Sequence, residues 1–216
     1  MHIPDGFLDV KTWTTLGAAS VAGVGLALRQ IRRDEDYSVK VPMIGMISAF
    51  IFASQMINFP IAGATSGHLG GAALATILFG PWVSMLVMST VLIIQCLFFQ
   101  DGGITALGAN IFNMGVIGSF TAYGIYMLVK SSSWKWVRMA GTFLAAWLAV
   151  EISAAAVAVE LALSGTAPLS AAMKAMLSWH ALIGIGEGII TVAVVAFFAE
   201  RMKSPALLPS SKGVKG

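Results

Sequence analysis

The sequence contains few charged residues and a single cysteine, and each shortage excludes a class of protein. Of its 216 residues only 11% are charged, whereas an average soluble domain has about 25%. So few charged side chains cannot give a chain of this length a surface that faces water. Cys96 is the only cysteine, which excludes a disulfide within the chain and any CxxC metal site. Because Cys96 lies in an apolar run, we interpret it as a small packed apolar side chain.

Several functional motifs are also missing. The sequence contains no GxxxxGK[ST] motif, so the chain does not bind ATP through a P-loop, and it contains no HExxH zinc motif. Its net charge of +3 is scattered over short loops without a basic, aromatic-rich face, which argues against nucleic acid as a partner. The N-terminus lacks the positive start of a secretory signal. We therefore expect the mature chain to begin at Met1, which the bulky His2 protects from removal.

Apolar residues are abundant. They make up 57% of the chain, and the mean hydropathy is +0.85. Roughly 20 apolar residues cross the core of a bilayer. The apolar stretches are residues 12–28, 41–59, 69–79, 82–99, 106–129, 136–163 and 175–199. They predict an all-α, polytopic membrane protein with about seven transmembrane helices, which form a single domain over residues 1–200 in contact with lipid.

The number of spans depends on the uncharged stretch from Leu69 to Phe99. A single straight helix of that length would rise about 46 Å, more than a bilayer core of about 30 Å requires. Two short spans joined at Gly80-Pro81 are the alternative, and the distribution of positive charge favours them. With seven spans and the N-terminus outside, nearly all Lys and Arg residues lie on the cytoplasmic side, and only Lys11 and Lys174 lie outside. The C-terminus, with a basic and disordered tail over residues 201–216, is then cytoplasmic.

The first two residues can chelate a metal ion. The free amine of Met1, the amide nitrogen of His2 and the imidazole Nδ1 of His2 can occupy three corners of a square around one ion. Square-planar nitrogen sites suit Ni(II) and Cu(II). His68 falls on the same external side and is the natural fourth ligand. Spacing alone leaves open that neither histidine binds metal, because the two are far apart in sequence.

Other polar residues have a role that the sequence leaves open between function and structure. Ionisable side chains inside a membrane are costly, and they tend to be functional or paired. His180 and Glu187 lie two helical turns apart, so they could form a structural pair or belong to a site. The residues left open are His180, Glu151, Glu160 and Glu187 in the spans, and Asp101, Asn110 and Asn113 as supports of the ligand histidines or as helix caps.

Several stretches resemble one known family over essentially residues 1–200. They are the opening Met1-His2-Ile3-Pro4-Asp5-Gly6-Phe7-Leu8, the loop 60–70 with His68, the run from Phe99 to Met114, and the late His180 and Gly186-Glu187. In these residues the chain resembles the CbiM/NikM family, the substrate-specific components of energy-coupling-factor (ECF) transporters for nickel and cobalt.

The resemblance implies a seven-helix fold with Met1, His2 and His68 as metal ligands. It implies a transporter subunit rather than an enzyme, with Ni(II) or Co(II) as transported ion and no cofactor. The implied partners are a transmembrane coupling subunit, two cytoplasmic ABC ATPases and a small accessory membrane subunit, all at the plasma (inner) membrane. Small residues of the first span, Ala18, Ala22 and Gly23, are candidates for contact with the coupling subunit. The choice between nickel and cobalt stays open.

Two other functions also stay open at this point. A stand-alone secondary metal carrier would use His180 and the three membrane glutamates as an ion path. An intramembrane hydrolase would use Ser66 as its nucleophile, although the sequence before Gly67 lacks the first glycine of a GxSG signature.

Overall fold

The computed structural model describes residues 1–32, 37–61 and 65–201. Arg33, part of the loop before His68 and all but the first residue of the predicted tail 201–216 lie outside the described residues. The helices are α1 (Val10–Ile31), α2 (Tyr37–Gln55), α3 (Ala72–Phe79), α4 (Pro81–Phe99), α5 (Leu107–Asn110), α6 (Gly118–Val129), α7 (Lys135–Leu163) and α8 (Leu169–Arg201). The predicted all-α class is confirmed.

The long apolar stretch from Leu69 to Phe99 forms two helices. Gly80 separates α3 from α4 with a φ of +88°, in the left-handed region that glycine adopts without a steric penalty. Pro81 follows as the first residue of α4, a position where the missing N–H costs no hydrogen bond. The predicted break is therefore confirmed. With eight residues, α3 rises only about 12 Å and cannot cross a bilayer core of about 30 Å by itself.

Among the residues that the structure describes, four helices are long and apolar enough to span a membrane. These are Pro81–Phe99, the continuous helix Leu107–Val129, Lys135–Leu163 and Leu169–Glu200, and a shorter apolar helix covers Lys40–Gln55. The chain is accordingly a multi-pass membrane protein. The number of seven spans and the external N-terminus stay predictions.

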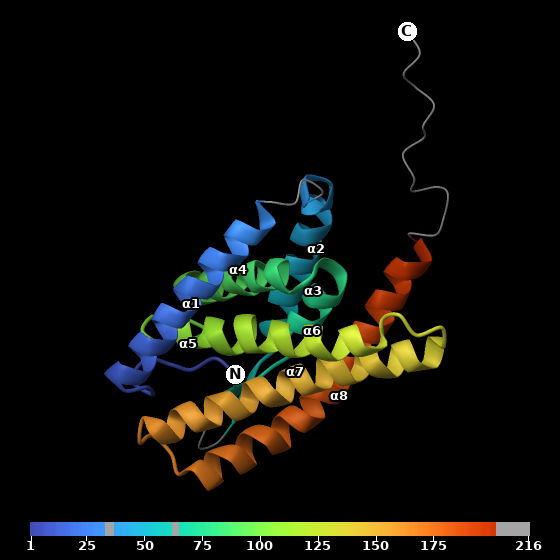
Figure 1. The fold of residues 1–216 in the computed structure, drawn as a ribbon. Coiled ribbons are helices and arrows are strands. Elements are labelled where there is room, and N and C mark those ends of the chain that lie inside the picture. The colour runs from blue at the N-terminus through green and yellow to red at the C-terminus, as the bar shows by residue number, and fades with distance from the viewer. Residues whose placement is uncertain (33–36, 62–64, 202–216) are drawn as a thin grey trace, which may run out of the picture.

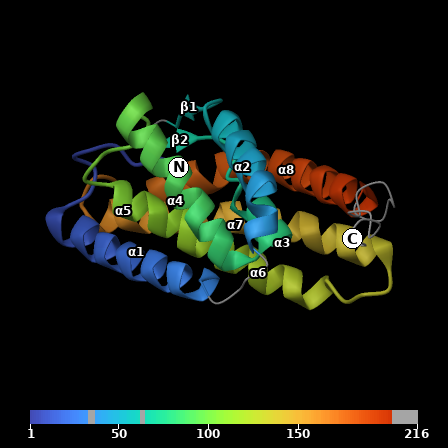
Figure 2. The same cartoon turned by 90° about the horizontal axis from the view of Figure 1, so that it is seen from above.

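The helices form a bundle around the N-terminal segment. In Figure 1, α7 and α8 run side by side as a long antiparallel pair, and α6 lies along α7. Seen from above in Figure 2, α1 and α2 flank α4, and the N-terminus lies among the helices. Between α5 and α6 the helix widens into a π-helical turn, η1 (Ile111–Ile117). Such turns are frequent at functional sites.

Close contact of main chains fixes α1 against α5. The Cα atom of Gly17 in α1 faces Gly108 in α5 with no space for a side chain on Gly108, and Ser20 Oγ donates a hydrogen bond of 2.6 Å to the Gly108 carbonyl. Gly23 is half-buried, and one side of it lies against Met85 and Val116. Ala18 and Ala22 do lie on the exposed side of α1.

Candidate metal centre

The N-terminal segment enters the bundle as an extended chain. Met1, His2 and Ile3 are each at most 3% exposed. The side-chain amide of Asn110 binds the main chain of Ile3 on both sides, accepting from its N–H at 2.9 Å and donating to its carbonyl at 3.2 Å. The N–H of Gly103 donates to the same carbonyl at 2.9 Å. The main chain is therefore held by specific partners before any metal is considered.

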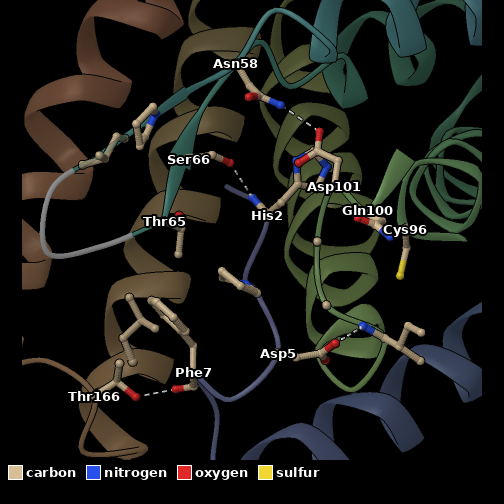
Figure 3. A pocket seen from close by; sticks show the side chains of 17 residues that line it. His2, Asp5, Phe7, Asn58, Thr65, Ser66, Cys96, Gln100, Asp101 and Thr166 are labelled. Atoms are coloured by element: carbon tan, nitrogen blue, oxygen red, sulfur yellow. Dashed lines mark hydrogen bonds and ion pairs between the residues drawn. The ribbon is translucent and has the colours of Figure 1, made fainter. Parts of the chain in front are cut away.

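Two further contacts anchor the following residues (Figure 3). The Asp5 carboxylate accepts hydrogen bonds from the N–H of Ile104 at 3.1 Å and from the N–H and hydroxyl of Thr105 at 2.7 and 2.5 Å. These bonds, with those from Thr105 the strongest, lower the pKa of Asp5. The Thr166 hydroxyl donates to the carbonyl of Phe7. The segment thus connects the α4–α5 loop with the α7–α8 turn.

The amine of Met1 meets the imidazole of His68. The two nitrogens, Met1 N and His68 Nε2, lie 2.7 Å apart. His68 Nδ1 lies 2.8 Å from the carbonyl of Leu69, so it donates its proton there and the lone pair remains on Nε2. Two nitrogens bound at right angles to one ion, each about 2.0 Å from it, would be about 2.8 Å apart. The spacing fits two adjacent corners of one coordination square.

A short hairpin places His68 and also supports the N-terminus. Strands β1 (Phe59–Pro60) and β2 (Ser66–Gly67) pair antiparallel directly before His68. The amine of Met1 donates to the carbonyl of Ser66. The Ser66 hydroxyl lies 3.2 Å from the amine of Met1 and 3.2 Å from the amide nitrogen of His2. Both main-chain nitrogens predicted to bind metal therefore meet the same residue.

The His2 ring stacks on the ring of His68, with centroids 4.3 Å apart and planes inclined by 19°. Its Nε2 lies 3.2 Å from Gln95 Oε1. Its Nδ1 is 3.1 Å from Asp101 Oδ1, which is within ion-pair distance. The angle between the two groups is unsuitable for a hydrogen bond. Asp101 is in turn held by Asn58, whose amide donates to the other carboxylate oxygen at 2.8 Å.

Burial favours the uncharged form of the candidate nitrogen ligands. Loss of water lowers the pKa of the Met1 amine, of His2 and of His68, most strongly for the amine and His68. For His68 the Met1 amine, His2 and, as the smallest contribution, His180 add to this by repulsion. Burial alone would raise the pKa of Asp101, but His2, the amine and Asn58 hold it below its usual value. The arrangement thus provides neutral nitrogen donors beside one carboxylate.

A hollow of about 940 Å³ opens beside His2. Figure 3 shows His2 and Asp101 at its inner wall, with Asn58 above and Asp5 and Phe7 below. In residues 1–32, 37–61 and 65–201, no three His, Cys, Asp or Glu side chains come together as a metal site. A metal centre in this region would depend on the terminal amine and on main-chain nitrogen.

The structure assigns contacts to several residues whose role the sequence leaves open. Asp101 lies against His2, as expected of a support of a ligand histidine. Asn110 instead binds the main chain of Ile3. Asn113 lies deeper, where its amide donates to Glu160 at 2.7 Å.

His180 and Glu187 do not form the pair that their spacing suggests. The Glu187 carboxylate accepts from the N–H groups of Gly70 and Gly71 at 2.9 and 2.7 Å, which satisfies free donors at the start of α3. His180 Nδ1 lies 2.7 Å from the carbonyl of Met176. One carboxylate oxygen of Glu151 is buried without a hydrogen-bond partner among the described residues.

Sequence reasoning missed Gln95, and it named Ser66 only as the nucleophile of the alternative hydrolase. Gln95 is fully buried in α4, and an amide inside an apolar span is itself a signal of a functional or paired group. Ser66 was considered only as a nucleophile, whereas here its hydroxyl and carbonyl contact the Met1 amine and its hydroxyl also contacts the His2 amide.

Comparison with known proteins decides the family. A family model described as the cobalt uptake substrate-specific transmembrane region, CbiM, matches residues 2–205. The chain belongs to the CbiM family. This confirms the resemblance seen in the sequence, and the relatives themselves are named as metal transport proteins.

Individual relatives agree with the CbiM assignment. The fused nickel transport protein NikMN of Rhodobacter capsulatus is 36% identical over 226 residues, which cover 96% of this chain and 64% of that protein. A relative from Archaeoglobus fulgidus is 40% identical, and the match covers 65% of its length. The chain therefore spans somewhat less than two thirds of these two relatives.

Solved structures show the same fold. A truncated transition metal transporter is 35% identical, with a TM-score of 0.87 over 93% of this chain and 99% of the other. The S component of a bacterial ECF transporter is 21% identical, with a TM-score of 0.57 over 78% and 99%. The second likeness concerns the fold alone.

Proposed function

We propose that this CbiM-family chain is the substrate-binding membrane subunit of an ATP-driven ECF-type importer for Ni(II) or Co(II). The observation that carries the proposal is the buried Met1 amine, 2.7 Å from His68 Nε2, whose lone pair faces the amine. A shared metal ion gives both lone pairs a partner.

The proposed ligands are the Met1 amine, the amide nitrogen and Nδ1 of His2, and Nε2 of His68. Binding through the amide removes its proton, so a divalent ion keeps one net positive charge. The Asp101 carboxylate beside His2 compensates that charge, as a buried charge requires. Gln95 Oε1 is placed to accept a hydrogen bond from His2 Nε2–H, which leaves Nδ1 as the metal-binding nitrogen.

The energy for transport would come from other subunits. The chain contains no P-loop, and its fold is that of an ECF S component. The proposed partners are a transmembrane coupling subunit, two cytoplasmic ABC ATPases and a small accessory membrane subunit, assembled in the plasma membrane. Uptake by the purified chain in liposomes without ATP would instead identify a stand-alone carrier.

The test of the metal site is to block the amine. Adding one residue before Met1 moves the free amine away from His68, so nickel binding should be lost in the purified protein. The same residue added after Gly216 is the matched control and should leave binding intact. Bound nickel is measured by metal analysis, and a square-planar ion is recognised by its visible absorption spectrum.

A second variant tests the fourth ligand. His68→Ala removes a direct ligand and should weaken nickel binding by at least about tenfold, since even loss of an indirect support commonly costs that much. Unchanged affinity in both this variant and the N-terminal extension would contradict the chelate.

A further inference from the structure

Besides His2 and His68, a third buried imidazole lies near the candidate metal centre, and one of its nitrogens lacks a hydrogen-bond partner among the described residues. His180 lies in α8 and is fully buried. Its Nδ1 lies 2.7 Å from the carbonyl of Met176, one turn earlier, and donates its proton there. Nε2 therefore carries the lone pair, yet it is buried with no hydrogen-bond partner among the residues that the structure describes. Buried nitrogens without a partner are rare in folded proteins and need an explanation.

The contacts of α8 show which way His180 faces. Met176 Sδ accepts a hydrogen bond from Thr65 at 3.7 Å. Ile183 lies close against Gly67, and Glu187 binds the N–H groups of Gly70 and Gly71. Positions 176, 180, 183 and 187 share one face of a helix. His180 therefore lies between residues that contact the segment on either side of His68.

Electrostatics agree with this placement. A positive charge on His180 would be felt at His68, whose lowered pKa includes repulsion by His180 besides the larger effects of burial, the Met1 amine and His2. His180 is also absent from the residues that line the hollow beside His2. The two sides of the centre thus differ: one faces the hollow, and the other faces His180 and the membrane helices.

We propose that His180 is a transient metal ligand, whose Nε2 takes the ion from the Met1-His2-His68 chelate on the side away from the hollow. This rests on the proposed function. A square-planar ion has open positions above and below its plane and exchanges ligands by first adding one. The bond from the ion to His180 Nε2 forms, and the bond to His68 Nε2 then breaks. The ion keeps its charge, and each nitrogen gives or recovers only a lone pair.

Such a step would help the chelate to release its ion. A site with a deprotonated amide holds its ion tightly, and a transporter must also release it. A donor that is already dehydrated and oriented lowers the barrier to leaving, because it replaces a ligand without waiting for water to reach the buried centre. His180 would then affect how fast the ion exchanges much more than how tightly it binds.

The experiment compares donor and non-donor side chains of similar size at position 180. The purified full chain is loaded with nickel and mixed with excess EDTA, and loss of the nickel absorption is followed in time. His180→Gln and His180→Ala should release nickel at least about tenfold more slowly than the unaltered protein, a change of the size that supports around metal sites commonly cause. His180→Met and His180→Cys, which keep a donor, should release it faster than their non-donor partners. Equilibrium affinity should stay essentially unchanged.

Release rates are compared between the two members of a pair, Gln with Met or Ala with Cys, and a pair is used only if both of its variants fold. Trp179→Phe, at an exposed position of the same helix turn, is the matched control and should exchange nickel normally. Equal release rates for donors and non-donors would overturn the proposal while leaving the proposed function intact. A joint loss of affinity and thermal stability in all His180 variants would assign the residue a structural role and also overturn it. If the unaltered chain holds no nickel, the proposed function itself fails.

Discussion

At the scale of single residues, the amine and imidazoles of the centre bind protons more weakly than those of a free Met-His peptide. In water the amine of such a peptide is charged at neutral pH and the imidazole is partly charged. In the structure burial lowers the pKa of the Met1 amine, His2 and His68, so each gives up its proton at a lower pH than in the free peptide. Protons then compete less with a metal ion for their lone pairs.

This difference predicts how many protons leave when nickel binds. Near pH 6.5 the lowered pKa values leave the buried amine and imidazoles fewer protons to lose, so the number released should approach the about one per ion that comes from the His2 amide. A free Met-His peptide at that pH should release more than two. Calorimetry in buffers of different ionisation enthalpy measures the number. Release of two or more protons by the protein would mean that its donors are charged before binding.

The sequence predicts the site only where the chemistry is local. Met1 and His2 are neighbours in the chain, so the chelate can be derived from covalent geometry, and the charge distribution places His68 on the same side. The contact of His2 with Gln95 and the shared support by Ser66 depend on packing of segments more than 60 residues apart. No local pattern encodes such contacts.

At the scale of elements, the loop between α4 and α5 determines whether the N-terminal segment fits. A side chain on Gly103 would meet the main chain of Pro4 and Asp5 directly. Gly102 has a φ of +95°, which side chains rarely tolerate. The two glycines allow the loop to lie flat on the segment that carries Met1 and His2.

Gly103→Ala should therefore weaken nickel binding at least about tenfold, because the segment must shift and misplaced ligands lose affinity even when all are present. Gly124→Ala, where a methyl group meets nothing within 4 Å, is the control and should change neither binding nor fold. Titration of both purified variants with nickel checks this. Normal affinity in the Gly103 variant would show that the segment can move without loss of the centre.

Helix boundaries could be predicted better than helix type. The Gly80-Pro81 break follows from backbone chemistry that needs no tertiary contact. The π-helical turn η1 could not be predicted, because its hydrophobic pattern is that of any helix. It is stabilised from outside, where Ser153 donates to the carbonyl of Asn113 at 2.8 Å. The N–H groups in front of α3 are likewise satisfied from a distant segment, by the carboxylate of Glu187.

At the scale of the whole molecule, the predicted orientation in the membrane can be described by the two ends of the helix bundle. The N-terminal segment and the α7–α8 turn lie at one end of the bundle, and the α6–α7 loop lies toward the other (Figure 1). The positive charges of the α6–α7 region predict that this second end is cytoplasmic. The first end, with the hollow, would then face outward.

Single cysteines can test this orientation. In a Cys96→Ser background, Ser170→Cys near the start of α8 should react with a membrane-impermeant maleimide in intact cells. Ser133→Cys in the α6–α7 loop should react only after the membrane is opened. Both serines are exposed, so accessibility to the reagent depends on the side of the membrane. The reverse pattern would place the N-terminus and the hollow on the cytoplasmic side.

The burial of the Met1 amine links this centre to the first steps of protein synthesis. In a cell that starts its chains with formylmethionine, the first nitrogen is an amide until a deformylase acts. That nitrogen is buried against His68, where a formyl group would add bulk and delocalise the lone pair. Removal of the formyl group from the nascent chain would then be a step in assembly of the metal centre. An inhibitor of the deformylase would leave a folded protein without its metal.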